Sequence, residues 1–295
     1  MDALSHALIA AIILIALGQP AFIPFAVIGA VIPDADIIFS LISDRSPRLY
    51  LFTHGGIAHS IAGAVALSVL AFLVIALIRI TGTMPDWVFA GYGIAAFLIV
   101  LSAALLHLFI DFLACPGIPL LAPFSDRKFT SGLLPGPSVL VMAASAGTLV
   151  LIVAGHVPII AALALYAAIV VLYVACRAGS FLYVRAMVPG RRVPTINPFR
   201  WLVITEDDAA FTVRYYTVFY GFSGGDVIEK FRNTNAREVE PYLDLAKVRR
   251  LAFYSWIMTA EKDNATLVFH DPLREKGYVW YPHKFQQVVI SEDSL

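Results

Sequence analysis

The sequence predicts an α-helical transmembrane bundle of about six helices, the first two short, followed by a small α+β domain in water. Mean hydropathy is +0.79 and only 14% of the 295 residues are charged, values outside the usual range of soluble globular proteins. The charged residues are also unevenly distributed. Residues 1–194 contain 7 Asp, no Glu and 9 Lys or Arg, whereas residues 195–295 contain 14 acidic and 12 basic residues.

This change of composition occurs at Arg191 to Pro194. We therefore expect a membrane-embedded domain over residues 1–190 and a water-soluble α+β domain over residues 195–295. The partner of that second domain is left open.

Apolar runs of roughly 20 residues are needed to cross a hydrocarbon core about 30 Å thick as a helix. The runs that meet this length are 57–80, 87–113, 136–154 and 157–177. Two shorter runs, 4–18 and 21–32, are separated by the turn signal Gly18-Gln19-Pro20. They predict a tight helical hairpin or two tilted half-spans.

If both short runs cross, the N-terminus, the loops 33–56 and 114–135 and the C-terminal domain share one side of the membrane. The basic residues on that side are Arg45, Arg48, Arg127, Lys128, Arg177, Arg185, Arg191 and Arg192. Only Arg79 flanks the other side. The positive-inside rule then predicts a multi-pass protein of the cytoplasmic (inner) membrane, with these loops on the cytoplasmic face.

The tail has its own pattern. Segments 201–205, 211–219, 265–269 and 286–290 are rich in β-branched and aromatic residues, which predicts strands of an antiparallel sheet. Residues 236–258 have a more helical spacing, and Gly221 to Gly225 are predicted to form a turn.

Two classes of site are disfavoured. The net charge is zero and there is no basic run interleaved with aromatic residues, so a nucleic-acid partner is not expected. Cys115 and Cys176 lie far apart, which argues against a thiolate zinc site.

Ionisable residues occur beside the apolar runs, where they are costly and often functional. His6 opens the first run, while Asp34 and Asp36 close the second. The remaining members of this set open the third run (His54 and His59) and close the fourth (His107 and Asp111). Because successive helices alternate in direction, all seven residues fall on the same face, and we expect them to converge.

Imidazole and carboxylate groups together suit zinc, manganese or iron better than calcium or magnesium. His107 and Asp111 are four residues apart, which places their Cβ atoms about 5–6 Å from each other on a helix, close enough for one metal or two adjacent ones. Asp34 and Asp36 are two apart and would point in different directions, so one is expected to bind metal and the other to orient a histidine or activate water. Each cluster by itself could also be a helix cap, a turn or a hydrogen-bonded pair. The occurrence of all four clusters together favours a divalent metal site, and zinc is the metal that we expect most.

The motifs LSHALI (4–9), PDAD (33–36), THGGIAHS (53–60) and HLFIDFL (107–113), followed by GIPLLAPFS (117–125), resemble the membrane-bound metal-dependent hydrolase family, including its LexA-regulated inner-membrane group. The resemblance covers residues 1–190. The family more often has Thr at the position of Ser5 and Arg at that of Gly55, and neither departure removes a candidate ligand. The H-x-x-x-D pattern is also distantly similar to zinc-dependent phospholipase C and single-strand nucleases, although no second H-x-x-x-E follows Asp111.

The resemblance implies a metal-dependent hydrolase that acts on a phosphoester of a membrane lipid or at headgroup level through metal-activated water. The residues expected to bind metal are His6, Asp34, Asp36, His54, His59, His107 and Asp111, with Asp34 and Asp36 as the catalytic pair that supplies the general base. The residues expected to hold an anionic headgroup are Arg45, Arg48, Arg127 and Lys128; alternatively, these four only fix the topology.

The alternative function is a non-catalytic membrane scaffold whose soluble domain binds a partner, or a metal or proton transporter. Transporters place polar groups near the bilayer midplane, whereas the long apolar runs here are almost free of ionisable residues at mid-depth. A scaffold would tolerate substitution of the His and Asp residues.

Overall fold

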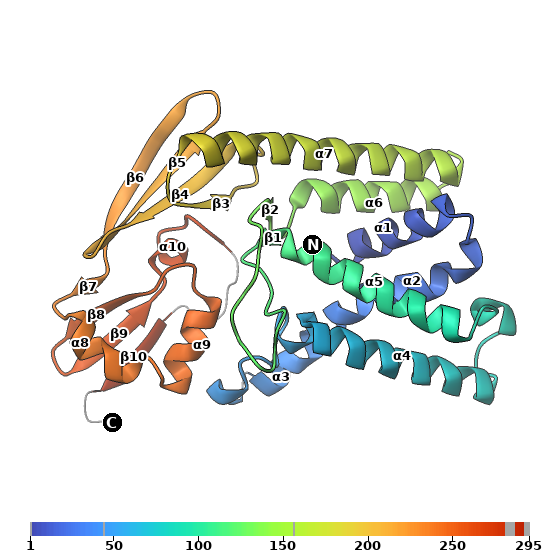
Figure 1. Cartoon of the computed structure of the whole chain (residues 1–295), viewed down its shortest axis with the longest axis horizontal. Helices are drawn as coiled ribbons and strands as arrows, with labels where there is room; N and C mark the ends of the chain where they lie inside the picture. The colour runs from blue at the N-terminus through green and yellow to red at the C-terminus, as the bar shows by residue number, and fades with distance from the viewer. Residues whose placement is uncertain (1, 44, 156, 281–286, 292–295) are drawn as a thin grey trace. The chain divides into compact units, whose positions relative to one another are not determined.

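The computed structural model describes residues 2–43, 45–155, 157–280 and 287–291, which divide into two compact units (Figure 1). The first unit comprises Met1–Ile42 and Leu51–Ala178, and the second comprises Ser43–Tyr50 and Gly179–Leu295.

The first unit is helical. Its elements, with η for a 3-10 helix, are α1 (Ala3–Ala16), η1 (Pro20–Phe22), α2 (Ile23–Val31), η2 (Ile32–Phe39), η4 (Ile57–His59), α4 (Ile61–Thr81), η5 (Asp86–Phe89), α5 (Ile94–Phe112), α6 (Val139–Val153) and α7 (Ile159–Met187), which continues into the second unit. In the loop between α5 and α6, β1 (Ala114–Cys115) pairs in parallel with β2 (Leu134–Pro135).

Four segments in the described part of the chain are long and apolar enough to cross a membrane: Pro20–Phe39, Ile61–Thr81, Ile94–Phe112 and Ile159–Met187. The predicted membrane helical region is therefore present, but its segments differ in length from the expected ones. The run 21–32 continues as η2 to Phe39, whereas the run 136–154 yields only the 15 residues of α6. Ser138 caps the start of α6 and Gly155, with a left-handed φ of 68°, follows its end, so the helix is shorter than the apolar run.

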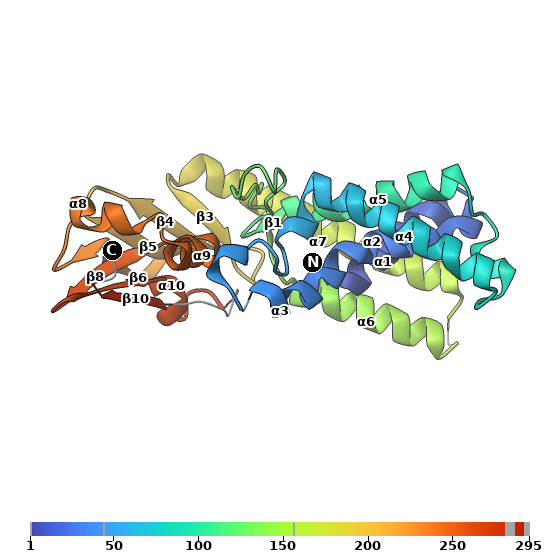
Figure 2. The same ribbon diagram turned by 90° about the horizontal axis from the view of Figure 1, so that it is seen from below.

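Helix α5 packs against α4 and α2, and α1 packs against α2 and α6 (Figures 1 and 2). The crossing of α2 on α5 is close because small residues meet there. A Cβ atom on Gly29 would lie 2.2 Å from the backbone oxygen of Val100 and 2.9 Å from the Cβ of Ala103. Small residues allow such backbone approach between membrane helices, and here they bring the carbonyl of Ala30 next to α5.

Caps define the helix ends that carry the ionisable residues. The Asp2 side chain accepts a hydrogen bond from the backbone N–H of Ser5 at 3.0 Å and starts α1 just before His6. Ser60 accepts from Gly63 N–H at 2.9 Å and starts α4 immediately after His59. Such caps satisfy backbone donors that have no partner within the helix.

The described residues of the second unit form two four-stranded sheets. The first has the order β3 (Arg191–Pro194), β4 (Arg200–Glu206), β5 (Ala210–Thr217), β6 (Gly221–Glu229), all antiparallel. The second has the order β10 (Gln287–Ser291), β9 (Thr266–His270), β8 (Thr259–Asp263), β7 (Phe231–Arg232), with β7 and β8 parallel. The helical elements are α8 (Ala236–Val239), η6 (Glu240–Tyr242), α9 (Ala246–Tyr254) and α10 (Pro272–Glu275). Leu251 of α9 and Phe269 of β9 are both buried in the core beside the second sheet.

The predicted turn at Gly221 to Gly225 is wrong, because these residues begin β6. Gly221, Gly224 and Gly225 have φ values of 72°, 52° and 150°, and the pairing of β5 with β6 shifts register between Arg214 and Tyr215. A β-bulge admits glycines with positive φ inside a strand. The glycines between Gly221 and Gly225 therefore belong to an irregular strand and not to a turn.

A short segment of the loop 33–56 packs with the second unit. It includes the end of α3 (Ser40–Ser43) and η3 (Pro47–Leu49), which contacts α9. Tyr50 is 7% exposed, its ring centroid lies 5.4 Å from that of Phe253, and Arg249 Nη2 donates to its hydroxyl at 3.4 Å. By packing, the second unit therefore includes this segment as well as the residues from Gly179 onward.

Candidate metal centre

The structure brings together side chains from the starts of α1 and α4 and from the ends of α2 and α5. His6 lies in the first turn of α1, and Asp34 and Asp36 lie in η2. His54 and His59 precede α4, whereas the other two residues, His107 and Asp111, occupy the last turns of α5. Helices that alternate in direction thus present all four sequence clusters at one end of the first unit.

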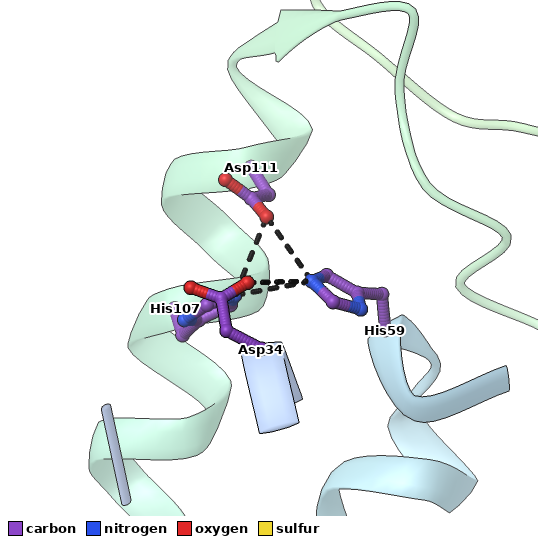
Figure 3. A group of neighbouring side chains, drawn as sticks. All are labelled: Asp34, His59, His107 and Asp111. Carbon is purple, nitrogen blue, oxygen red and sulfur yellow. Dashed lines mark hydrogen bonds and ion pairs between the residues drawn. The ribbon is translucent and has the colours of Figure 1, made fainter. Parts of the chain in front are cut away.

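Four of these residues point toward one another: Asp34, His59, His107 and Asp111 (Figure 3). The Nε2 atoms of His59 and His107 are 3.3 Å apart. Asp111 Oδ2 lies 3.5 Å from the first and 3.3 Å from the second. Asp34 Oδ1 lies 3.4 Å and 3.6 Å from the same two atoms. All four donor atoms lie within 4.8 Å of one another.

Five of the six separations among the four donors match those of a tetrahedral site, and the sixth, between Asp34 and Asp111, is within 4.8 Å. Zinc binds imidazole nitrogen and carboxylate oxygen at about 2.0–2.2 Å, and the edge of a tetrahedron is about 1.6 times its centre-to-corner distance, which gives donor separations of about 3.3–3.6 Å. The five separations above span 3.3–3.6 Å. The donors therefore fit a single ion of this size.

The far nitrogens of both histidines are hydrogen-bonded. His107 Nδ1 lies 2.7 Å from the backbone oxygen of Ala30, which can only accept, so Nδ1 is the donor. His59 Nδ1 lies 3.0 Å from Asp36 Oδ2. With protons on both Nδ1 atoms, both Nε2 lone pairs face the centre, as metal-binding histidines require.

Asp36 lies behind this centre. Its fully buried carboxylate faces His54 Nδ1 at 2.8 Å and His59 Nδ1 at 3.0 Å, and it accepts from the backbone N–H of Gly55 at 3.2 Å. Asp36, His54 and His59 also form a three-residue donor group. Their separations of 2.8 and 3.0 Å are those of hydrogen bonds and are shorter than the separation between two ligands of one ion. The contacts thus favour a positioning role for Asp36.

His6 lies beside the four donors. Its ring stacks on that of His107 with centroids 3.7 Å apart, and its Nε2 lies 3.4 Å from Asp111 Oδ1, the oxygen turned away from His59 and His107. The side chain is 1% exposed, and neither ring nitrogen has a hydrogen-bond partner within the described residues. His6 therefore borders the centre without belonging to the four-donor set.

The four predicted anion-binding residues are distributed over two units. Arg45 and Arg48 are exposed and belong to the second unit. Arg127 is exposed, with its guanidinium 5.6 Å from the centroid of Phe129, and Lys128 is half-buried. Their role in holding an anionic group remains a prediction.

Sequence reasoning missed two features around the centre. One is the Ala30 carbonyl, since a backbone acceptor leaves no signal in residue identity. The other is a buried polar contact beside His6, where the hydroxyls of Ser5 and Ser145 are 2.8 Å apart and that of Tyr166 lies 3.0 Å from Ser145. Isolated serines inside apolar runs were the available signal for it.

A family model described as YdjM inner membrane protein matches residues 1–180, a range that contains all seven predicted metal-site residues. The chain therefore belongs to the YdjM inner membrane protein family, which fits the LexA-regulated inner-membrane group indicated by the motifs. Searches of curated proteins and of solved structures found no match. The likeness to hydrolases and to phospholipase C remains a prediction.

Proposed function

We propose that this member of the YdjM inner membrane protein family is a metal-dependent hydrolase that cleaves a phosphoester of a membrane lipid. The observation that carries the proposal is that five of the six donor separations among Asp34, His59, His107 and Asp111 lie in the range of the edges of a tetrahedral metal site.

The donor set favours zinc. Two imidazoles and two carboxylates are borderline ligands that suit zinc, and with added water ligands they also suit manganese or iron. Calcium and magnesium prefer shells made of oxygen alone.

Four protein donors fill a tetrahedral shell, so a zinc ion held by all four would bind water only at a fifth position. Water bound to it there would have its pKa lowered to about 7 and would supply a nucleophile at neutral pH. The protein's own contribution is positioning. Ala30 and Asp36 hold the two histidines with Nε2 toward the centre. The side chains of Asp34 and Asp111 are each 12% exposed, whereas those of His59 and His107 are at most 1% exposed. We infer that water and substrate reach the centre from the carboxylate side.

His54 is our candidate for proton transfer. Its side chain is 41% exposed, and Nδ1 is held 2.8 Å from Asp36, so Nε2 is the ring nitrogen that we propose for the proton transfer. His54 precedes Gly55, whose φ of 72° favours glycine and turns the chain before α4. In this assignment Asp36 positions two histidines and Asp34 binds metal, which refines the general-base role expected for the pair.

A lipid phosphoester is the proposed substrate because the donors lie at the ends of apolar helices, and the ends of helices that span a bilayer lie at the level of the headgroups. Arg127 and Lys128, in the loop that follows α5, are proposed to contact the phosphate, and Arg45 and Arg48 are further candidates. By the positive-inside rule, the basic residues of these loops support a cytoplasmic orientation of this face.

The test is metal content measured by elemental analysis on the full chain in lipid nanodiscs supplied with zinc, manganese and iron. Wild type is expected to carry stoichiometric metal, and the double variant His107→Ala, Asp111→Ala is expected to lose it. His270→Ala is the matched control, because His270 belongs to the second unit and pairs with Glu275.

Metal that is retained by the control and lost by the double variant would justify a screen of phospholipid and soluble phosphoester substrates. Wild type that is folded by circular dichroism and gel filtration yet free of metal would overturn the proposal. The scaffold reading would then be preferred.

A further inference from the structure

His6 is a buried histidine whose ring nitrogens have no hydrogen-bond partner among the residues that the structure describes. Its side chain is 1% exposed, and both Nδ1 and Nε2 are shielded from solvent. Burying a polar side chain without a partner is costly, so buried polar atoms in folded proteins are nearly always hydrogen-bonded. A buried imidazole in this state is suited to bind a ligand that the chain itself does not supply.

Asp111 is the acidic residue that faces His6. The distance between His6 Nε2 and Asp111 Oδ1 is 3.4 Å. Hydrogen bonds from N–H to oxygen are usually about 2.7–3.2 Å long, and the Nδ1 atoms of His107 and His59 make bonds of 2.7 and 3.0 Å. The His6 contact is longer than these bonds. It instead lies within the range of about 3.3–3.6 Å expected for two donors of one tetrahedral ion.

Asp111 presents one oxygen to each of two histidines. Oδ2 lies 3.3 Å from His107 Nε2, whereas Oδ1 faces His6 and is turned away from the four-donor group (Figure 3). The His6 and His107 rings are stacked, with centroids 3.7 Å apart and planes 22° from parallel. A carboxylate whose two oxygens face two different imidazoles can bridge two metal ions. The ions of two-metal sites are about 3.5–4 Å apart, a separation similar to that of the two rings.

The position beside His6 is separate from that of the first ion. His6 does not belong to the four-donor group, whose donor atoms all lie within 4.8 Å of one another. It faces Oδ1 of Asp111, whereas His59 and His107 face Oδ2. His6 is therefore not a fifth ligand of the ion that the four donors fit.

We propose that the candidate metal centre holds two ions, with Asp111 as the bridge and His6 Nε2 and Asp111 Oδ1 as the protein ligands of the second. This inference rests on the proposed function, because it requires the first ion. Two protein donors leave the second ion with open positions that water and a phosphate oxygen of the substrate can fill. The second ion is therefore bound more weakly than the first, and it is the ion that contacts the phosphoester.

The experiment counts bound manganese by equilibrium dialysis of the full chain in nanodiscs, without any substrate. Wild type is expected to bind two ions per chain, and His6→Ala and His6→Phe are expected to bind one. Phenylalanine keeps a ring that can stack on His107 but has no nitrogen, so this variant separates the lost ligand from the lost stacking. His270→Ala, in the second unit, is the matched control and should bind two ions.

Electron paramagnetic resonance supplies a second readout. Two manganese ions bridged by one carboxylate are magnetically coupled, so the spectrum of an isolated ion should weaken and broaden when wild type receives its second equivalent. The His6→Ala and His6→Phe proteins should retain the spectrum of an isolated ion.

The outcomes separate this inference from the proposed function. One ion in wild type that both His6 variants retain would overturn the second site and leave the proposed function standing. Loss of all metal in folded His6 variants would also overturn it, because His6 would then belong to the first ion. Two uncoupled ions that the His6 variants retain would overturn it by placing the second ion elsewhere. No metal in folded wild type would overturn the proposed function and this inference together.

Discussion

His107 Nδ1 donates a hydrogen bond to the backbone oxygen of Ala30 at 2.7 Å. This bond joins the candidate metal centre to the crossing of α2 and α5, because Gly29 beside Ala30 faces Val100 and Ala103 on α5. The position of a ligand nitrogen thus depends on how closely two helices approach.

Gly29→Ala is expected to separate α2 from α5, since its new Cβ would lie 2.2 Å from the Val100 oxygen. Overpacking of this kind costs about 1–3 kcal/mol, and we expect lower thermal stability together with weaker metal binding. Gly147→Ala is the control, because nothing lies within 4 Å of its added Cβ in α6. Equal melting temperatures and metal affinities in the two variants would contradict this account of the crossing.

Asp36→Asn tests the positioning role of that carboxylate. An amide offers one acceptor oxygen where the carboxylate serves His54, His59 and Gly55. Loss of such an orienting partner typically lowers metal affinity about 10–100-fold, and we expect a decrease in this range by competition with a chelator. Asp263→Asn, at the exposed end of β8 in the second unit, should leave the affinity unchanged. Complete loss of metal in a folded Asp36→Asn protein would instead make Asp36 a ligand.

His54→Ala separates proton transfer from metal binding. Because His54 is outside the four-donor group, the variant should retain metal, whereas His59→Ala should lose it. Where a phosphoester substrate is found, His54→Ala should lower kcat by about 10²–10⁴-fold, the usual contribution of a general acid or base. Metal loss in His54→Ala as complete as in His59→Ala would assign His54 to the metal.

Tyr50→Ala tests the segment that packs with the second unit. Tyr50 is 7% exposed and stacks near Phe253, and truncation of a buried aromatic side chain costs about 3–5 kcal/mol. We expect a lower melting temperature in the intrinsic fluorescence transition and earlier cleavage in limited proteolysis. Arg45→Ala, an exposed change in the same segment, should have little effect. If both variants have the same melting temperature as wild type, the segment does not stabilise this unit.

The predicted orientation can be tested by cysteine labelling in spheroplasts, with Cys115 and Cys176 replaced. A membrane-impermeant maleimide should label Met84→Cys in the α4–α5 turn, and it should reach Arg127→Cys only after permeabilisation. Both side chains are exposed, so accessibility within the protein does not separate them. The reversed pattern would place the candidate metal centre on the outer face.

The elements most accurately predicted were those set by local pattern. Helices α4 and α5 lie within or close to the apolar runs 57–80 and 87–113. Strands β4 and β9 coincide with the β-rich segments 201–205 and 265–269. The rule that successive helices alternate in direction was enough to predict that His6, Asp34, His59 and Asp111 lie at the same end of the helices. Local pattern failed at Gly221 to Gly225, where strand pairing with β5 overrides the turn preference of glycine.

The sequence by itself determined that the chain is a membrane protein with a second domain and with histidines and aspartates gathered at one end of its helices, because hydropathy, charge and helix alternation depend on residue order alone. Only the tertiary structure decided which of those residues face a common point. Asp34 and Asp36 are indistinguishable by spacing, yet one faces His59 Nε2 and His107 Nε2 while the other faces His54 Nδ1 and His59 Nδ1. That choice follows from side-chain direction in η2 and from the close packing of α2 on α5, which bring together atoms far apart in the chain.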